Sequence, residues 1–301
     1  MTSSPKVENM FSVEGRVALI TVAYHDSGGG AGGLGALMAE GLVANGARVY
    51  LVGRKEDTLK VEVSRLDKIS PGKARHFAMD ITVEEDVDKL VKFIEQYEDS
   101  LDFLVNNAGL SIFGPPASYL DPLDKLQANL KEPPLETWKA CLATNSWAPY
   151  TLTVSFLHLL ARAAQKGGRG SVLFITASGT QSWNPNLKFS GYISTRVGAE
   201  HIARILAAKL TPHRIRVNVV VPGIFPSIAT RPDDPQGLAY PNTVSHIVPF
   251  KRAGFPEELI GTIIYLASAA SGYMTGERIA VDGGFGLISN GTNKFLPDGA
   301  L

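Results

Sequence analysis

The sequence predicts an α/β fold, a doubly wound parallel sheet of seven strands in a single domain. Short apolar runs alternate with amphipathic stretches almost to the end of the chain, and this alternation is typical of parallel sheets with right-handed crossovers. Each run is apolar on both faces and rich in β-branched or aromatic residues, as strands covered by helices on both sides must be. The 301 residues show no internal repeat and no linker-like change in composition, so we expect one domain over residues 1–301.

The expected strands, in chain order, are residues 16–22, 47–52, 74–79, 101–106, 171–177, 214–221 and 278–284. Helical periodicity fills the intervals between them. One predicted helix ends at Asn45-Gly46 and has an apolar face made of Leu34, Leu37, Met38 and Leu42. Another stops ahead of Pro212, and its apolar face is made of Ile202, Ile205, Leu206 and Leu210.

Three segments depart from this pattern. Residues 114–136 are proline-rich and predict a long insertion with one short helix. Residues 222–250 hold six prolines and are expected to form a mobile lid, because long loops in compact domains are usually functional or disordered. The tail after Gly286 is polar and rich in Gly and Asn.

Composition excludes several classes of function. The 29 basic and 29 acidic side chains cancel, which disfavours a nucleic-acid or anionic-membrane partner, since both need an excess of Lys and Arg. The single cysteine, Cys141, rules out an intrachain disulfide, and the scattered histidines argue against a metal site. No signal peptide or membrane-spanning run is apparent, so a soluble cytoplasmic protein is expected.

Glycines cluster directly after the first predicted strand, where six fall within residues 28–35. Gly30-x-Gly32-x-x-Gly35 and Gly28-x-Gly30-x-x-Gly33 both match the dinucleotide-binding fingerprint, and Leu34 opens the helix that follows. Glycines let the backbone approach a pyrophosphate, and the helix N-terminus offers unpaired N–H groups. The alternative is a flexible turn that binds nothing.

The end of the second strand bears on cofactor choice. An acidic residue there would bind the ribose hydroxyl of NAD, whereas arginine suits the 2′-phosphate of NADP. Arg54 and Lys55 stand at that position and favour NADP over NAD, although they could also be an ordinary surface pair.

An ordered set of motifs continues along the chain: LVNNAG at 104–109, Asn145, Ser178, Tyr192 and Pro222-Gly223. Together they resemble the short-chain dehydrogenase/reductase family from about residue 11 to residue 284. The stretch PGIFPSIATR at 222–231 is most similar to rhamnolipid-type 3-oxoacyl reductases and their fungal relatives. The resemblance implies a Rossmann-type domain, assembled as dimers or tetramers.

The resemblance also implies the roles of individual residues. Tyr192 would protonate a carbonyl oxygen as hydride arrives from the nicotinamide, and Ser178 would hydrogen-bond the same oxygen. Asn145 would hold a water. The cofactor would be contacted by Asp80 at the adenine, by the turn Asn107, Ala108 and Gly109, and by Pro222 and Gly223.

One departure from the family concerns the cation beside the tyrosine. The family has a lysine four residues after the tyrosine, on the same helical face, and this chain has Arg196. A tyrosine is a poor acid–base group at neutral pH without nearby positive charge. Arg196 can supply that charge and bind ribose hydroxyls, but it cannot pass a proton along a relay as lysine can.

A second departure lies in the cofactor loop. Six residues, 22–27, separate Thr21 from Gly28, whereas the family runs from the strand threonine directly into glycine. The insertion could loop outward, could come from a misread gene boundary, or could obstruct the cofactor, because Asp26 would bring negative charge toward an anionic ligand.

The expected function is an NADP(H)-dependent oxidoreductase that interconverts a ketone and a secondary alcohol. Loops after the strands carry candidate substrate contacts, and their apolar character suits a lipophilic or polyketide-like substrate: Ile112, Phe113, Trp183, Phe225 and Ile228. The alternative is a non-redox or catalytically impaired member of the same fold, suggested by Arg196 and the loop insertion.

Overall fold

The computed structural model describes residues 6–22, 33–111, 120–131, 133–167, 169–181, 190–225 and 248–288. Its seven strands form one fully parallel sheet in the order β3-β2-β1-β4-β5-β6-β7. The seven strand predictions are confirmed. Their bounds are β1 Val17–Thr21, β2 Arg48–Gly53, β3 Ala74–Ala78, β4 Phe103–Asn106, β5 Ser171–Ile175, β6 Arg216–Pro222 and β7 Arg278–Val281.

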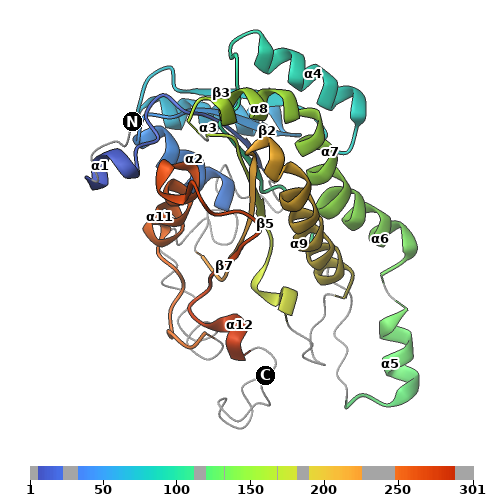
Figure 1. The fold of residues 1–301 in the computed structure, drawn as a ribbon. Coiled ribbons are helices and arrows are strands. Elements are labelled where there is room, and N and C mark those ends of the chain that lie inside the picture. Colours follow the sequence, from blue (N-terminus) through green and yellow to red (C-terminus); the bar gives the residue numbers. More distant parts are fainter. Residues whose placement is uncertain are drawn as a thin grey trace.

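Helices alternate with the strands (Figure 1). The α-helices are α1 Val7–Met10, α2 Leu34–Ala44, α3 Glu56–Asp67, α4 Glu84–Glu95, α5 Leu123–Leu130, α6 Leu135–Leu142, α7 Ala148–Ser155, α8 Leu157–Gln165, α9 Ser190–Leu210, α11 Pro256–Ala267 and α12 Phe285–Ile288. The described residues also include one π-helical turn, η1 at Ala143–Trp147, and the 3₁₀ turns η2 Ser178–Gln181, η3 Thr211–His213 and η4 Ala269–Ser271.

Both predicted helix ends are confirmed. α2 ends at the C-cap Asn45, and Gly46 follows with a φ of +88°, a left-handed conformation that favours glycine. α9 stops at Leu210, and Pro212 lies in the 3₁₀ turn that follows. The short helix expected within 114–136 is α5, and α6 begins inside the same interval.

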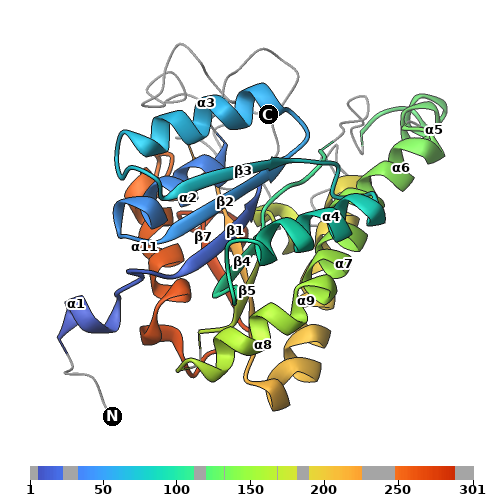
Figure 2. The ribbon, with the colours of Figure 1, turned by 90° about the horizontal axis from the view of Figure 1, so that it is seen from above.

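Alternate residues of each strand face two separate helix layers. In β1, Val17 and Leu19 join the core that includes residues of α4, α7, α8 and α9, whereas Ala18 and Ile20 join the core of α2, α3 and α11. Figure 2 shows α2 and α11 on one side of the sheet and α4, α7 and α9 on the other. Because both faces are covered, strands such as β1 and β5 are buried throughout.

The strand order reverses between β1 and β4. The chain winds from β1 outward to β3, then returns to place β4 on the other side of β1. In open α/β sheets, ligands bind at the carboxyl ends of the strands at such a switch point. Arg54, Asn107 and Ser178, all expected to be functional, follow the carboxyl ends of β2, β4 and β5, so the topology brings them to one edge.

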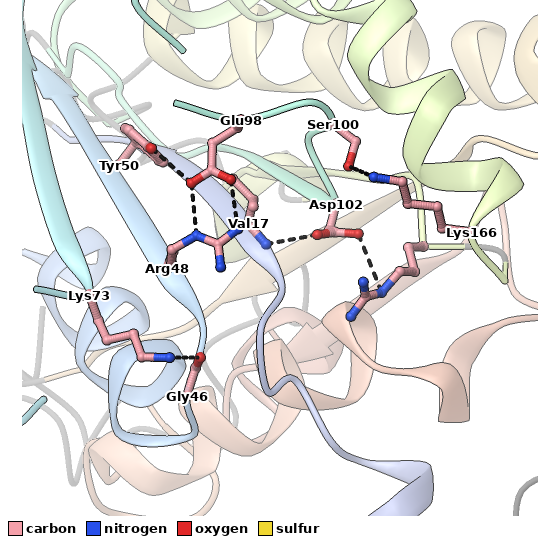
Figure 3. Close-up of polar contacts among 10 residues, drawn as sticks. Val17, Gly46, Arg48, Tyr50, Lys73, Glu98, Ser100, Asp102 and Lys166 are labelled. Atoms are coloured by element: carbon pink, nitrogen blue, oxygen red, sulfur yellow. Dashed lines mark hydrogen bonds and ion pairs between the residues drawn. The ribbon is translucent and has the colours of Figure 1, made fainter. Parts of the chain in front are cut away.

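The opposite, amino edge of the sheet is held by polar contacts (Figure 3). The Glu98 carboxylate accepts two hydrogen bonds from Arg48, at 2.8 and 2.6 Å, and a third from the Tyr50 hydroxyl at 2.9 Å. Asp102 accepts from the Val17 N–H at 2.8 Å, which joins β4 to the start of β1. Burial and the bond to Glu98 raise the pKa of Tyr50, so this phenol stays protonated and structural.

Candidate active site

The carboxyl ends of β1 and β4 are joined by hydrogen bonds to Thr21. Thr21 Oγ1 accepts hydrogen bonds from the backbone N–H groups of Asn107 (3.0 Å) and Ala108 (2.9 Å), and the Asn107 amide donates to the Thr21 carbonyl at 2.9 Å. The turn that begins with Asn107 and continues to Gly109 is therefore fixed in position against β1. This is the part of the chain expected to contact the adenosine side of a cofactor.

The described end of the glycine cluster packs closely on that turn. Gly33 caps the N-terminus of α2, Leu34 begins the helix, and Gly35 lies beside Val22 and Asn107. A Cβ on Gly35 would come within 2.6 Å of Val22 Cγ1 and 2.8 Å of Asn107 Nδ2, so glycine is required for this approach of helix to strand. Gly28 and Gly30 lie outside the described residues.

The first residue after Thr21, with which the expected six-residue insertion begins, is packed against the sheet. Val22 is 6% exposed, it packs in the core, and its N–H donates to the Val52 carbonyl at 2.8 Å. Val22 is thus a core residue by hydrogen bonding and burial. Residues 23–27 lie outside the described part of the chain.

A pocket of about 240 Å³ opens at the switch point. It is lined from the carboxyl ends of four strands, by Val22, Arg54, Asp80 and Gly109 among others, and by Ala140 and Thr144 on the facing side. Arg54 is exposed at the pocket edge. The Asp80 carboxylate accepts from the Thr82 N–H (2.9 Å) and hydroxyl (2.7 Å), which fixes the turn after β3. Arg54 and Lys55 make this end of the pocket suitable for an anion.

Asn145 lies in the π-helical turn η1 and is fully buried. Its Nδ2 donates to the Leu110 carbonyl (2.9 Å) and to Thr195 Oγ1 (2.9 Å), and its Oδ1 accepts from the Leu110 N–H (2.8 Å). The side chain therefore ties the turn after β4 to α9. Both hydrogens of the side-chain amide are used in these contacts. The expected water could therefore bind this side chain only by donating a hydrogen bond to the second lone pair of Oδ1. Short π-helical segments of this kind often occur at functional sites.

Helix α9 carries Tyr192 and Arg196 on one face. The Arg196 guanidinium carbon lies 5.5 Å from the centroid of the Tyr192 ring, and Nη1 donates to the Ile175 carbonyl at 3.0 Å. Arg196 is only 6% exposed. Its Nη2 lies against Gly109, where an added Cβ would overlap it. Arg196 thus spans the carboxyl ends of β4 and β5 beneath Tyr192.

Ser178 begins the 3₁₀ turn η2, three residues after β5 ends, and is partly exposed. The next residue, Gly179, contacts Ile193 of α9, where a Cβ would come within 2.8 Å of Ile193 Cδ1. The serine turn and the helix that bears Tyr192 are therefore packed together.

The remaining predicted positions lie at the ends of β6 and β7. Pro222 ends β6, and the Gly223 N–H donates to the Val281 carbonyl at 2.9 Å. Phe225 is 6% exposed and lies in the core cluster, where it also borders a second pocket of about 300 Å³ with Phe250 and Asp282. Ile112, Phe113, Trp183 and Ile228 lie outside the described residues, as do residues 226–247 of the expected lid.

Sequence reasoning missed two polar residues of this edge, Thr195 and Glu200, and gave Thr21 no structural task. The Thr195 hydroxyl accepts a hydrogen bond from the side-chain amide of Asn145 and donates one to the Tyr192 carbonyl at 2.8 Å. Glu200 accepts hydrogen bonds from residues on both sides of Ser178. Helical spacing was the available signal, because Thr195 follows Tyr192 by three positions and Glu200 follows Arg196 by four.

Among the described residues, no group of His, Cys, Asp or Glu could hold a metal ion, and no helix is long and apolar enough to cross a membrane. The fold and this edge define the class of protein: a doubly wound α/β domain of the dinucleotide-binding type, with Ser178 following β5 and Arg196 bonded to the end of that strand.

Comparison with known proteins gives the family. A family profile described as enoyl-(acyl carrier protein) reductase matches residues 29–286. A rhamnolipids biosynthesis 3-oxoacyl-[acyl-carrier-protein] reductase from Pseudomonas aeruginosa is 33% identical, over 92% of this chain and 98% of its own. The short-chain dehydrogenase/reductase VdtF of Byssochlamys spectabilis is 31% identical, over 95% of this chain and 97% of its own.

The solved structures agree. An RhlG/NADP active-site complex from Pseudomonas aeruginosa superposes with a TM-score of 0.76 at 30% identity, covering 92% of this chain and 98% of that one. The chain belongs to the short-chain dehydrogenase/reductase family, whose members are oxidoreductases acting on CH–OH groups.

Proposed function

We propose that this protein is an NADP(H)-dependent oxidoreductase that interconverts a ketone and a secondary alcohol, with Ser178 and Tyr192 as its catalytic pair. The observation that carries the proposal is the placement of Arg196. It lies one helical turn below Tyr192, donates to the Ile175 carbonyl at the end of β5 and contacts Gly109 after β4. The cation is thus held where the tyrosine, the serine turn and the cofactor-binding turn converge.

The residues present fit a bound NADP. The switch-point pocket is bordered by Arg54 and Lys55, whose charges suit a 2′-phosphate. Among the described residues, Arg196 Nε is a buried donor with no hydrogen-bond partner, and a ribose hydroxyl would satisfy it. The similar Pseudomonas aeruginosa structure is described as an NADP complex. NAD is the less favoured cofactor because the position of the acidic residue is occupied by Arg54.

The chain's own residues then have distinct tasks. The bound nicotinamide would supply or accept the hydride. The Tyr192 hydroxyl would donate its proton to the carbonyl oxygen, and the Ser178 hydroxyl would hydrogen-bond that oxygen and orient it. Arg196 would stabilise negative charge on the phenolic oxygen once the proton has left. Because a guanidinium keeps its proton, the tyrosine must be reprotonated by a route other than Arg196.

The substrate class follows from apolar candidates and from relatives. Phe225 and the four apolar residues named with it favour a lipophilic or polyketide-like ketone. The Pseudomonas relative is named for reduction of a 3-oxoacyl group carried on acyl carrier protein. A cytoplasmic enzyme fits the single cysteine, which needs no oxidising compartment.

The test is a binding and turnover experiment. The purified protein would be titrated with NADPH and with NADH by fluorescence, and NADPH oxidation would be followed with a panel of aliphatic and aromatic ketones. We expect tighter binding of NADPH and turnover that Tyr192→Phe abolishes while NADPH binding survives. NADPH binding without turnover, equal in wild type and Tyr192→Phe, would overturn the assignment.

The second candidate is a non-redox or impaired member of the same fold. The contact from Arg196 Nη1 to the Ile175 carbonyl favours it, because that nitrogen is occupied by the protein and the site lacks a lysine relay. The same titration separates the two candidates, since binding alone would support this one.

We also propose self-association into dimers or tetramers through α6, α7 and α9. These helices and η1 expose large apolar side chains at 37–55% of their surface: Trp138, Leu142, Trp147, Tyr150, Val154, Val197 and Ile205. A second copy of the chain is the expected occupant, since apolar patches of this kind mark protein interfaces. Tyr150→Asp should shift the mass measured by light scattering toward the monomer. Val61→Asp, an exposed control on α3, should not.

A further inference from the structure

We propose that Glu200 is a positioning residue for Ser178, and that it holds the serine turn at a fixed distance from Tyr192. The inference rests on the proposed function, because it concerns the same catalytic pair. It is carried by hydrogen bonds that fasten both ends of the turn to one carboxylate.

The two residues fastened are Thr176 and Thr180. The Thr176 hydroxyl donates to Glu200 Oε1 at 2.9 Å, and the Thr180 hydroxyl donates to the same oxygen at 2.6 Å. Ser178 stands midway between these threonines. Thr176 is also held at its backbone, where its N–H donates to the Val220 carbonyl of β6 at 3.0 Å. The serine thus sits in a short loop whose two arms meet at Glu200.

The second carboxylate oxygen is held by Arg278, the first residue of β7. Arg278 Nε donates to Glu200 Oε2 at 3.1 Å, and Nη2 donates to the Thr180 hydroxyl at 3.3 Å. The side chains of Glu200 and Arg278 are 16% and 14% exposed. In this partly buried setting the ion pair orients the carboxylate, because each of its oxygens has a defined donor.

The tether comes from the same helix as the tyrosine. Tyr192, Arg196 and Glu200 follow one another at intervals of four on α9, which places them along one helical face. Arg196 holds the end of β5 through Ile175, and Glu200 holds the turn that follows it. A rigid helix therefore sets the separation between the proton donor and the serine. Misplacement of a catalytic group by about 1 Å can reduce a rate on the order of a hundredfold.

The experiment compares Glu200→Gln and Glu200→Ala with Glu98→Gln. Glu98 is a matched control, since it also pairs with an arginine and a hydroxyl but lies at the amino edge. We expect Glu200→Gln to lower kcat about tenfold, with the Kd for NADPH unchanged and Glu200→Ala more severe. Glu98→Gln should lower Tm yet leave kcat unchanged. Equal loss of kcat in both variants would assign Glu200 a general structural role and overturn the proposal.

A double-mutant cycle tests whether Glu200 acts through Ser178. In a Ser178→Ala background, Glu200→Gln should have no further effect on kcat, because the hydroxyl it positions is gone. Independent, multiplicative losses would contradict the inference. Thr176→Ser should restore the rate that Thr176→Val loses, since the serine hydroxyl can make the same bond.

A readout without turnover separates this inference from the proposed function. Amide hydrogen exchange over residues 176–181 should rise in Glu200→Ala and not in Glu98→Gln. Unchanged exchange would overturn the tether even in an active enzyme. Faster exchange in a protein that binds NADPH but reduces no ketone would leave the tether standing while the reductase assignment failed.

Discussion

The guanidinium of Arg196 stands 5.5 Å from the centre of the Tyr192 ring and, through Nη1, holds the carbonyl of Ile175 at 3.0 Å. The side chain that replaces the family's lysine is therefore built into the ends of two strands as well as into the surroundings of the tyrosine. A substitution of Arg196 should therefore disturb the strand ends as well as the surroundings of Tyr192.

Arg196→Lys should reduce the ketone reductase rate, by about tenfold in kcat/KM, although it restores the family's usual residue. A lysine has one charged nitrogen and cannot reproduce both the bond to Ile175 and the packing on Gly109. Steady-state kinetics with a fixed ketone would measure the change. A rise in kcat instead would show that the missing proton relay limits the natural protein, and would favour the impaired alternative.

Gly109→Ala should displace Arg196 and lower both activity and Tm. An added Cβ would overlap the Arg196 guanidinium, which is enclosed and has little freedom to move. The control is Gly261→Ala in α11, where nothing lies within 4 Å of the new Cβ. That change should leave activity intact and raise stability by about 1 kcal/mol, the helix propensity difference between the two residues. Thermal melts and steady-state kinetics of both variants would measure these effects. Equal Tm values and equal rates in the two variants would contradict the close contact between Gly109 and Arg196.

Arg54→Ala should weaken NADPH binding about tenfold or more while NADH binding stays the same. Loss of a charge-assisted hydrogen bond to a phosphate costs about 1.5–3 kcal/mol. Lys60→Ala serves as a control cation, since Lys60 pairs with Glu56 on α3. Fluorescence titrations with both cofactors measure the ratio of affinities. A parallel loss of NADH affinity would mean that Arg54 does not select the 2′-phosphate.

Glu258 predicts a pH-dependent contribution to stability. A hydrogen bond from Arg252, followed by one from the Phe255 N–H, lowers the pKa of Glu258 from 4.5 to about 2. The carboxylate is therefore favoured in the folded state, and its stabilisation is present above pH about 4.5 and lost as the pH falls toward 2. The Tm difference between wild type and Glu258→Gln should shrink between pH 6 and pH 3.5, as measured by thermal melts or calorimetry. Because the pair is exposed, added salt should shrink it too.

The fold was largely predictable from the sequence because parallel strands covered on both sides are continuous apolar runs. The helix ends at Asn45-Gly46 and before Pro212 were marked by residues that favour a helix C-terminus or cannot continue the helix. Ser178, Tyr192 and Asn145 were singled out by the resemblance of the ordered motifs to the family. The hydrogen bonds that hold this site in place could not be predicted from the sequence. Those from Arg196 to Ile175 and from Thr176 to Glu200 join residues more than twenty positions apart, and such pairs leave no periodic pattern in the sequence.

Hydropathy also misses buried charge. Arg16 is 7% exposed at the start of β1, and burial lowers its pKa to about 10. Nothing in the pattern of the surrounding residues distinguishes this arginine from one in water. At the same amino edge Asp102 lies beside Arg169, with a nitrogen–oxygen distance of 3.4 Å, and nothing in the sequence pattern pairs these two residues.

Thr21 and Gly35 together give the cofactor loop two fixed ends. Before the loop, Thr21 is bonded to the turn after β4 and Val22 to β2; after it, Gly35 is pressed against Val22 and Asn107. Since doubling the length of a flexible loop costs only about 0.6 kcal/mol, the number of residues between these ends can vary at little expense. Insertions and deletions between Val22 and Gly35 should therefore be tolerated, because the sheet and helix α2 would keep their relative position.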